Sequence, residues 1–210
     1  MQQYTSHVTG MVSNVADQLV LGHLDLVGDG IVAVLAFMAG AMVCALLINF
    51  ARRKNLGSEY ALPLLLEALL ILCFGLLGAQ LAHFETLLVP FTVLLLCFIM
   101  GLQNAIVTKL SNAVIRTTHM TGIVTDLGIE LGKLLYWNRD PDTPGHVRAN
   151  RDRLKVLIGL LSCFLMGGIT GALGFELAGY AFTVPIALVL AVMALVPAID
   201  DLQLGDHPHR

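Results

Sequence analysis

The chain has 210 residues, of which 57% are hydrophobic and 13% are charged, and its mean hydropathy is +0.80. A soluble domain carries about 25% charged residues, so this composition predicts an all-α integral membrane protein and argues against a soluble globular fold. The net charge of −3 gives no reason to expect nucleic acid as a partner. The four cysteines lie inside apolar runs, so we expect no disulfide framework and no cysteine-based metal site.

Five apolar runs are each about 20 residues long, which is the length needed to cross a hydrocarbon core of about 30 Å at 1.5 Å per residue. In chain order these predicted spans cover approximately residues 31–50, 60–82, 87–107, 154–175 and 177–199. A polar tail follows at 201–210. We therefore predict about five transmembrane helices in a single membrane domain, 1–210.

Two polar, glycine-bearing motifs share one pattern of side chains. The first begins at Ser6 and the second at Thr118, and in each the order is hydroxyl, imidazole, hydroxyl, glycine, hydroxyl and then a short amide or acid. The matched positions are Ser6 and Thr118, His7 and His119, Thr9 and Thr121, Gly10 and Gly122, Ser13 and Thr125, and Asn14 and Asp126. Two predicted spans follow each motif, and residues 37–42 match residues 164–169. The chain therefore contains an internal duplication.

The duplication divides the chain into repeat 1, about 1–83, and repeat 2, about 86–200, with a short motif helix expected before the first and the fourth span. The span at 87–107 precedes the second motif and has no counterpart before the first. Because a complete repeat of three spans would invert the second copy, we predict an inverted three-helix repeat whose first helix is missing. Either a misassigned start has removed that helix, or the protein lacks it.

The distribution of positive charge predicts the orientation of the chain. All 12 Lys and Arg residues lie in or beside segments that alternation of the spans places on one side of the membrane. These segments are loop 51–58, the longer stretch 108–153 and the C-terminal tail. Short loops follow the positive-inside rule well, so we expect all three to be cytoplasmic.

Several stretches together resemble the YoaK family of bacterial inner-membrane proteins, which is labelled as a domain of unknown function. They are Gly101-Leu102-Gln103-Asn104-Ala105, Arg116-Thr117-Thr118-His119-Met120-Thr121-Gly122 and Asp126-Leu127-Gly128. The first motif is similar to the family's Ser-His-x-Thr-Gly-Asn signature, with Met11 where the family usually has Asn. The resemblance implies six spans in a bacterial plasma (inner) membrane, and this chain lacks the first of them, which usually carries Gly-x-x-Asp-Ala. It implies no established substrate or catalytic residue.

We interpret each motif as a loop that ends at a helix N-terminus, with Gly10 or Gly122 permitting a sharp bend or close helix approach and Thr118 or Thr121 as the cap. Helix N-termini favour anions, so two such ends would suit a small anionic or zwitterionic solute. The candidate substrate-binding residues are His7, Thr9, Gly10, Gln103, Asn104, Thr118, His119, Thr121, Gly122 and Asp126. The alternative is that these side chains only cap helices and bond between them. Two histidines without a third ligand do not predict a metal site.

Two further acids are candidate proton-coupling groups. Glu67 lies inside the second predicted span, and the matching region of repeat 2 is apolar. Glu130 lies one helical turn after Asp126, so the two share a helix face. The alternative for Glu67 is a residue close enough to the inner end of its span to reach water, and the alternative for Asp126 is a first-turn acid favoured by the helix dipole.

Two functions remain open at this point. The duplication and the paired motifs favour a small-solute transporter or permease with its site between inverted repeats. A non-transporting scaffold or partner subunit, whose motifs are structural, fits the small residues on the helix faces equally well. No H-E-x-x-H, G-x-S-x-G or Walker motif occurs, so we predict no enzyme and no cofactor. The expected partners are the lipid bilayer, the solute and a second copy in a homo-oligomer.

Overall fold

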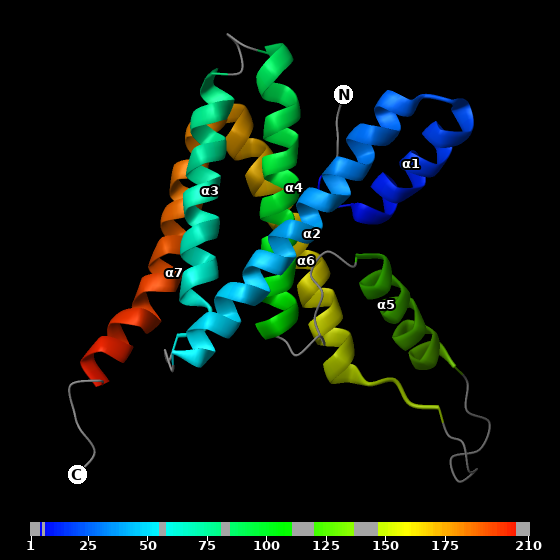
Figure 1. Ribbon diagram of the computed structural model, residues 1–210. Helices are drawn as coiled ribbons and strands as arrows, with labels where there is room; N and C mark the ends of the chain where they lie inside the picture. The colour runs from blue at the N-terminus through cyan, green and yellow to red at the C-terminus, as the bar shows by residue number, and fades with distance from the viewer. Residues whose placement is uncertain are drawn as a thin grey trace. The chain divides into compact units, whose positions relative to one another are not determined.

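The computed structural model describes residues 5, 7–54, 58–80, 85–110, 120–136 and 147–204, with the side chains of all of these except 80, 85–87 and 197–204. Every regular element in these ranges is helical, as predicted (Figure 1). The elements are α1 (Val8–Leu21), α2 (Leu24–Arg53), α3 (Ala61–Gln80), α4 (Glu85–Leu110), α5 (Met120–Leu135), α6 (Arg151–Ala178), the 3₁₀-helix η1 (Gly179–Phe182) and α7 (Thr183–Leu204).

Within the described ranges, four helical segments are long and apolar enough to cross a membrane. They are Leu24–Arg53, Ala61–Ala79, Leu88–Leu110 and the continuous stretch Arg151–Val196. The last has 46 residues and runs through α6, η1 and α7. It is interrupted at Gly179, whose φ of 57° lies in the left-handed region that L side chains rarely adopt. The predicted all-helical class is therefore confirmed for the described residues, and the length and composition of these segments are consistent with a membrane protein.

The helix limits differ from the predicted spans mainly at the start of α2. The predicted span began at residue 31, whereas the helix begins at Leu24 and includes Asp25 and Asp29. Asp25 lies in the first turn, where the helix dipole favours an acid, and Asp29 lies one turn later; neither ends the helix. A hydropathy pattern marks the apolar part of a helix and misses its polar first turns.

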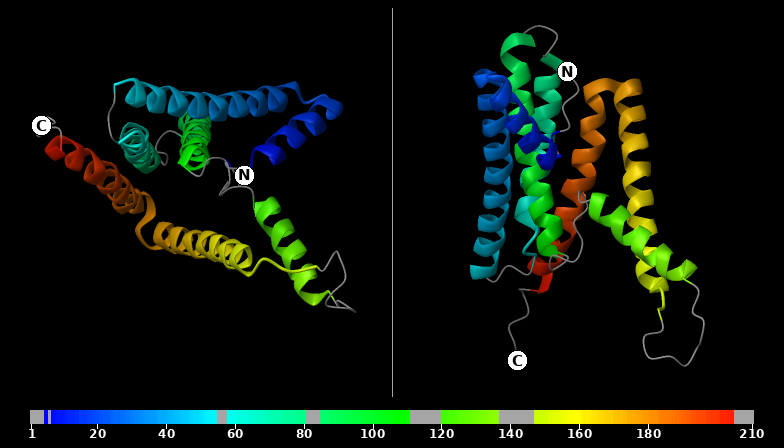
Figure 2. Two further views of the ribbon diagram at one scale, coloured as in Figure 1. Left: turned by 90° about the horizontal axis from the view of Figure 1, so that it is seen from below. Right: turned by 90° about the vertical axis from the view of Figure 1, so that its right-hand side faces the viewer.

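The chain divides into two compact units, which we describe separately. Unit 1 comprises 1–116 and 178–210, and unit 2 comprises 117–177. In unit 1 the most extensive contact is between α2 and α4, followed by that between α3 and α7; α1 packs on α2, and α3 also contacts α4 (Figure 2). Unit 2 contains α5 and α6.

Two glycines allow α2 and α4 to approach until their backbones touch. A Cβ atom at Gly40 would overlap the carbonyl oxygen of Phe98 on α4, and one at Gly101 would overlap the carbonyl oxygen of Phe37 on α2. Such close approach through small residues is a common way for helices to associate in lipid. Below the crossing, a core of Cys44, Ile48, Leu102 and Ile106 is covered by leucines of α3.

The contact between α3 and the η1–α7 segment also depends on small and aromatic residues. Thr183 is buried and its Oγ1 donates a hydrogen bond to the carbonyl oxygen of Tyr180 at 2.8 Å, which closes the turn into α7. The ring of Tyr180 packs edge-to-face against Phe74 of α3, with the ring centroids 5.8 Å apart. A Cβ atom at Gly75 would overlap the Thr183 hydroxyl, so α3 is held tightly against this turn.

The substitution Gly40→Ala tests the α2–α4 crossing. The added methyl group would collide with backbone that cannot move aside, and overpacking of this kind costs about 1–3 kcal/mol. We therefore expect a lower melting temperature in detergent, by roughly 2–4 °C for each kcal/mol in a chain of this size. The matched control is Gly28→Ala, in the same helix, where a Cβ atom meets nothing within 4 Å. Equal melting temperatures for the two variants would contradict the proposed close contact.

Candidate functional site

Each motif leads into a helix. Helix α1 begins at Val8, directly after His7, and the described part of α5 begins at the equivalent position, Met120. The motif glycines, Gly10 and Gly122, are consequently the third residues of their helices. The expectation that they form a bend in a preceding loop is wrong, because both glycines are already helical.

The geometry gives another reason for glycine at position 10. A Cβ atom there would overlap Nδ1 of His7, so the imidazole lies over the first turn of α1. His7 is the N-cap residue but its side chain makes no capping hydrogen bond. Its ring is exposed. Thr9 lies in the same first turn and is also exposed.

The second motif is only partly described. Thr118 and His119 lie outside the described residues. Thr121 is the second residue of α5, so it is not the cap, and its carbonyl oxygen accepts a hydrogen bond from Thr125 Oγ1 at 2.8 Å.

A groove along the α2–α4 crossing contains one of the predicted site residues. It has a volume of about 310 Å³. Its lining residues are Phe37, Ala41 and Ala45 of α2 and Gly101, Asn104, Ala105, Thr108 and Lys109 of α4. The walls are mostly apolar, and the polar groups are all on α4. Binding sites for small molecules have this composition, with a few polar groups among apolar ones.

The polar groups of the groove differ in whether they have hydrogen-bond or ion-pair partners among the described residues. The amide of Asn104 donates through Nδ2 to the carbonyl oxygen of Met100 at 2.8 Å, and it is half-buried. Lys109 is exposed in the last turn of α4, and among the described residues its ammonium group has no ion-pair partner. Gln103, which precedes Asn104, is exposed and does not line the groove. As far as the structure describes the chain, the groove therefore offers one unpaired positive charge.

Glu67 is buried within the membrane-length helix α3, with only 2% of its surface exposed. Within the described part of the chain its carboxyl group makes no hydrogen bond or ion pair. It lies close enough to the thiol of Cys44 on α2 for the two groups to interact electrostatically. Glu67 therefore lies, as predicted, inside a helix long and apolar enough to cross a membrane, and its burial within the protein does not fit the alternative in which it reaches water.

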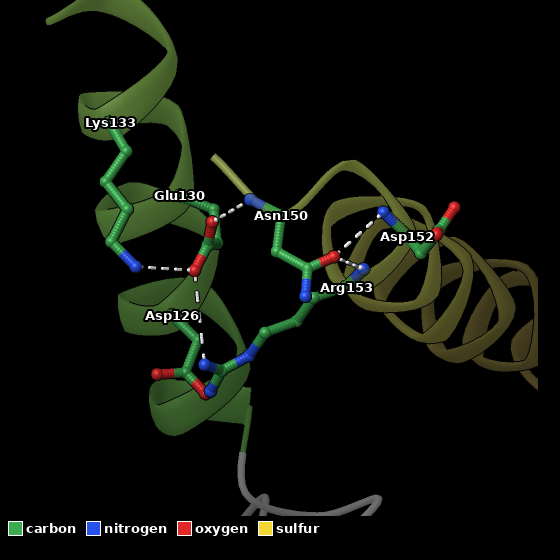
Figure 3. Close-up of polar contacts among 6 residues, drawn as sticks. All are labelled: Asp126, Glu130, Lys133, Asn150, Asp152 and Arg153. Atoms are coloured by element: carbon green, nitrogen blue, oxygen red, sulfur yellow. Dashed lines mark hydrogen bonds and ion pairs between the residues drawn. The ribbon is translucent and has the colours of Figure 1, made fainter. Parts of the chain in front are cut away.

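Asp126 and Glu130 project from one face of α5 toward the start of α6 (Figure 3). Glu130 is 2% exposed, and its Oε1 lies 2.8 Å from Nζ of Lys133 while its Oε2 accepts the backbone N–H of Asn150 at 2.8 Å. Arg153 adds a second cation, with Nη1 at 4.0 Å from Glu130 Oε1 and Nη2 at 2.8 Å from Asp126 Oδ2. We call these five residues the α5–α6 clasp.

Asn150 connects the clasp to the helix that follows. Its Oδ1 accepts the backbone N–H groups of Asp152 and Arg153 at 3.1 and 3.0 Å, which is the N-cap arrangement. Asn150 was not predicted as a site residue, although an Asn directly before a helix that begins with Arg151 and Asp152 is a recognisable capping signal. The hydrogen bond from the backbone N–H of Asn150 to Glu130, 20 residues earlier, could not be recognised from the local sequence.

The first motif helix makes a neutral version of the same contact. With the histidines aligned, Gln18 of α1 corresponds to Glu130 of α5. Oε1 of Gln18 lies 2.8 Å from Nδ1 of His23, the residue directly before α2, and its Nε2 donates to Asn14 at 3.3 Å. After both motifs, therefore, a side chain in the third turn of the motif helix binds the residue that precedes the next helix. The second motif helix has two acids, Asp126 and Glu130, where the first has two amides.

The charges of the clasp control the ionisation of Glu130. The hydrogen bond from Lys133 contributes most, the Asn150 N–H and the charge of Arg153 add to it, and together they lower the pKa of Glu130 below its ordinary value of 4.5. In the part of the chain that the structure describes, no group of three or more His, Cys, Asp or Glu side chains is arranged to hold a metal ion.

A model of one protein family, described as proteins of unknown function (DUF1275), matches residues 1–196. The match covers both motif helices and all four segments of membrane-crossing length. Comparisons with curated proteins and with solved structures found no match.

The substitution Glu130→Gln tests the clasp. It keeps the shape of the side chain but removes the charge that Lys133 and Arg153 neutralise, so we expect faster hydrogen exchange at the start of α6. In the native protein the carboxylate contributes stability that is complete above pH 4.5 and is lost as the pH falls through the lower pKa of the folded state. Glu130→Gln should not show this acid loss.

The matched control for that measurement is Asp152→Asn. Asp152 pairs only with Lys155, at 3.5 Å, and both side chains are largely exposed. An exposed pair of this kind contributes little, so the control should exchange like the native protein. If Glu130→Gln also exchanges like the native protein, the clasp does not hold α5 and α6 together.

Proposed function

The chain belongs to the DUF1275 family, which is the YoaK family, and we propose that it is a multi-pass membrane protein that carries a small anionic or zwitterionic solute across a bacterial plasma membrane. In this proposal the chain crosses the bilayer five times. The segment Arg151–Val196 crosses twice, because 46 residues of helix would extend for about 69 Å, more than twice the thickness of the hydrocarbon core. The C-terminus and the loops 51–58 and 108–153 are cytoplasmic.

We further propose that the two copies form inverted repeats with the solute site between them. The equivalent starts of α1 and α5 support this arrangement, as does the long helix that follows each of them. Three helices per complete repeat would place the two motif helices on opposite sides of the membrane. Many secondary transporters are built in this way, with the solute near the middle of the bilayer.

The single observation that carries a transport function is the groove on α2 and α4. It combines apolar walls, the amide of Asn104, the hydroxyl of Thr108 and the unpaired ammonium group of Lys109. A carboxylate or phosphate group would pair with Lys109, and the small residues Ala41 and Ala45 leave room for the rest of the solute. Lys109 also lies in the last turn of α4, where the helix dipole favours a positive charge and the charge stabilises the helix. The experiment must therefore distinguish a loss of solute binding from a loss of protein stability.

A scaffold without transport activity is the second candidate, and the α5–α6 clasp favours it. Asp126 and Glu130, which were candidate solute and proton ligands, are occupied by Arg153, Lys133 and Asn150. In that case the second motif serves to fasten a helix, and its polar residues have no further role.

The first experiment is a thermal-stability screen of the purified protein against amino acids, carboxylates and phosphate. A solute at 100 times its dissociation constant adds about 2.7 kcal/mol, which is a shift of several degrees for a chain of this size. We expect Lys109→Ala to lose the shift and Lys109→Arg to retain part of it, because Arg keeps the charge. Lys155→Ala, an exposed lysine of α6, is the control and should bind normally.

The outcomes separate the two candidates. A solute whose shift is lost in Lys109→Ala, and which enters proteoliposomes made with the native protein but not with this variant, supports transport through the groove. A flat screen, with Lys109→Ala and His119→Ala merely less stable than the native protein, supports the scaffold and rejects the transport proposal.

The orientation has a test of its own. A green fluorescent protein fused after residue 210 should fluoresce, because it folds in the cytoplasm and not in the periplasm. Alkaline phosphatase fused after residue 84 should be active, because the proposed topology places that loop outside. The reverse pair of results would invert the topology and remove the basis for the cytoplasmic assignment of 108–153.

A further inference from the structure

Glu67 combines three features that rarely occur together. It carries an ionisable group, it is 2% exposed inside a helix of membrane-crossing length, and it has no hydrogen-bond or ion-pair partner among the described residues. Glu130 provides a comparison within the same chain, because it is equally buried but has partners in Lys133 and Asn150. Burial alone therefore does not explain why Glu67 has no hydrogen-bond or ion-pair partner among the described residues.

Among the described residues, and apart from the polar ends of α2, the helices that pack against α3 carry one positive charge, that of Lys109, and it makes no ion pair with Glu67. The titratable side chains described on the helices that pack against α3 are Cys44 of α2, Cys97 and Lys109 of α4, and Tyr180 of η1, apart from those at the polar ends of α2. Of these, the thiol of Cys44 interacts electrostatically with Glu67, and Lys109 acts on that same thiol. Leucines of α3 cover the neighbouring core.

An isolated carboxylate in such a place is very costly, so this arrangement favours the neutral form of the group, which carries a proton. A neutral carboxyl group without partners still lowers stability, because its O–H and C=O groups have lost their hydrogen bonds to water. Repeat 2 avoids this cost, since its matching region, Ile186 to Val189, is apolar. A leucine at position 67 would be cheaper, so the acid needs an explanation other than packing.

We propose that Glu67 is a proton-binding site of the membrane region, which exchanges its proton with water when the helices around it rearrange. On release the O–H bond breaks, the proton passes to a water molecule and the carboxylate remains; on return to the buried arrangement the carboxylate takes a proton back. One proton is bound and released per cycle. This inference rests on the proposed transport function and adds one element to it. The proton is the ion whose movement is coupled to that of the solute.

The test is chemical labelling of the purified, full-length protein with dicyclohexylcarbodiimide, an apolar reagent that reacts with protonated carboxyl groups in membrane regions. We expect mass spectrometry to find the N-acylurea adduct at Glu67, with labelling several-fold greater in mildly acidic than in alkaline buffer. A water-soluble carbodiimide should label Glu67 several-fold less than the apolar reagent. Glu130 is the control for a carboxyl group that is covered but ion-paired and lies outside the segments of membrane-crossing length, so it should not react.

Each result decides for or against the proposal. Absence of the adduct at Glu67 in acidic buffer would overturn it, since no protonated acid would then be present. An adduct that forms equally at all pH values would also overturn it, because the proton would not exchange with water. Glu67→Gln should remove the adduct, but the labelling of the native protein stands even if this variant fails to fold.

The labelling reaction does not depend on any solute. A negative labelling result can therefore be distinguished from a negative result in the solute screen, which tests the proposed function. A flat solute screen with pH-dependent labelling of Glu67 would keep the proton site and reject the solute. A solute that binds at Lys109, with no labelling of Glu67, would keep the permease and reject proton binding.

Discussion

The contact between the backbones of α2 and α4 at Gly40 and Gly101 is the constraint on which unit 1 depends. In lipid the hydrophobic effect does not drive helices together, so their association relies on close packing and on polar contacts. The two glycines provide the first of these, and the core of Cys44 and Leu102 lies next to them. The groove that contains Lys109 lies along the same crossing, and Glu67 lies near Cys44, so both features depend on this close approach.

The two buried acids show two solutions to one electrostatic problem. Glu130 is kept as a carboxylate by Lys133, Arg153 and the start of α6, and this contact fastens two helices. Glu67 has none of these partners, so a proton is the cheapest way to keep it neutral. The same residue type, equally buried, therefore has a structural role in one case and the character of a functional group in the other.

Composition and periodicity predicted a helical membrane protein, because apolar runs of about 20 residues have the length of a membrane-spanning helix. The paired motifs predicted the family correctly. The start of α2 at Leu24 and the helical state of Gly10 were not predicted, because hydropathy does not detect polar first turns and glycine is compatible with either a bend or a helix. The span count and the inverted arrangement remain predictions.

The candidate site was less predictable than the fold. Asn104 was chosen because it is polar inside a span, but Lys109 was not, since a lysine at the end of a helix is ordinary. The pairing of Glu130 with Asn150 joins residues separated by 20 positions, and no periodic pattern within one helix can reveal it. Contacts across a loop depend on how two helices meet, which the local sequence does not specify.

The substitution of acids for amides between the two motif helices has a consequence for how each copy responds to its surroundings. The contact between Gln18 and His23 involves a neutral amide, whereas Asp126 and Arg153 form an ion pair in which both side chains are about half exposed. Dissolved ions screen the second kind of contact far more than the first. The attachment of α5 to α6 will therefore loosen as ionic strength rises while that of α1 to α2 changes little, so a duplicated sequence has produced two junctions of which only one senses salt.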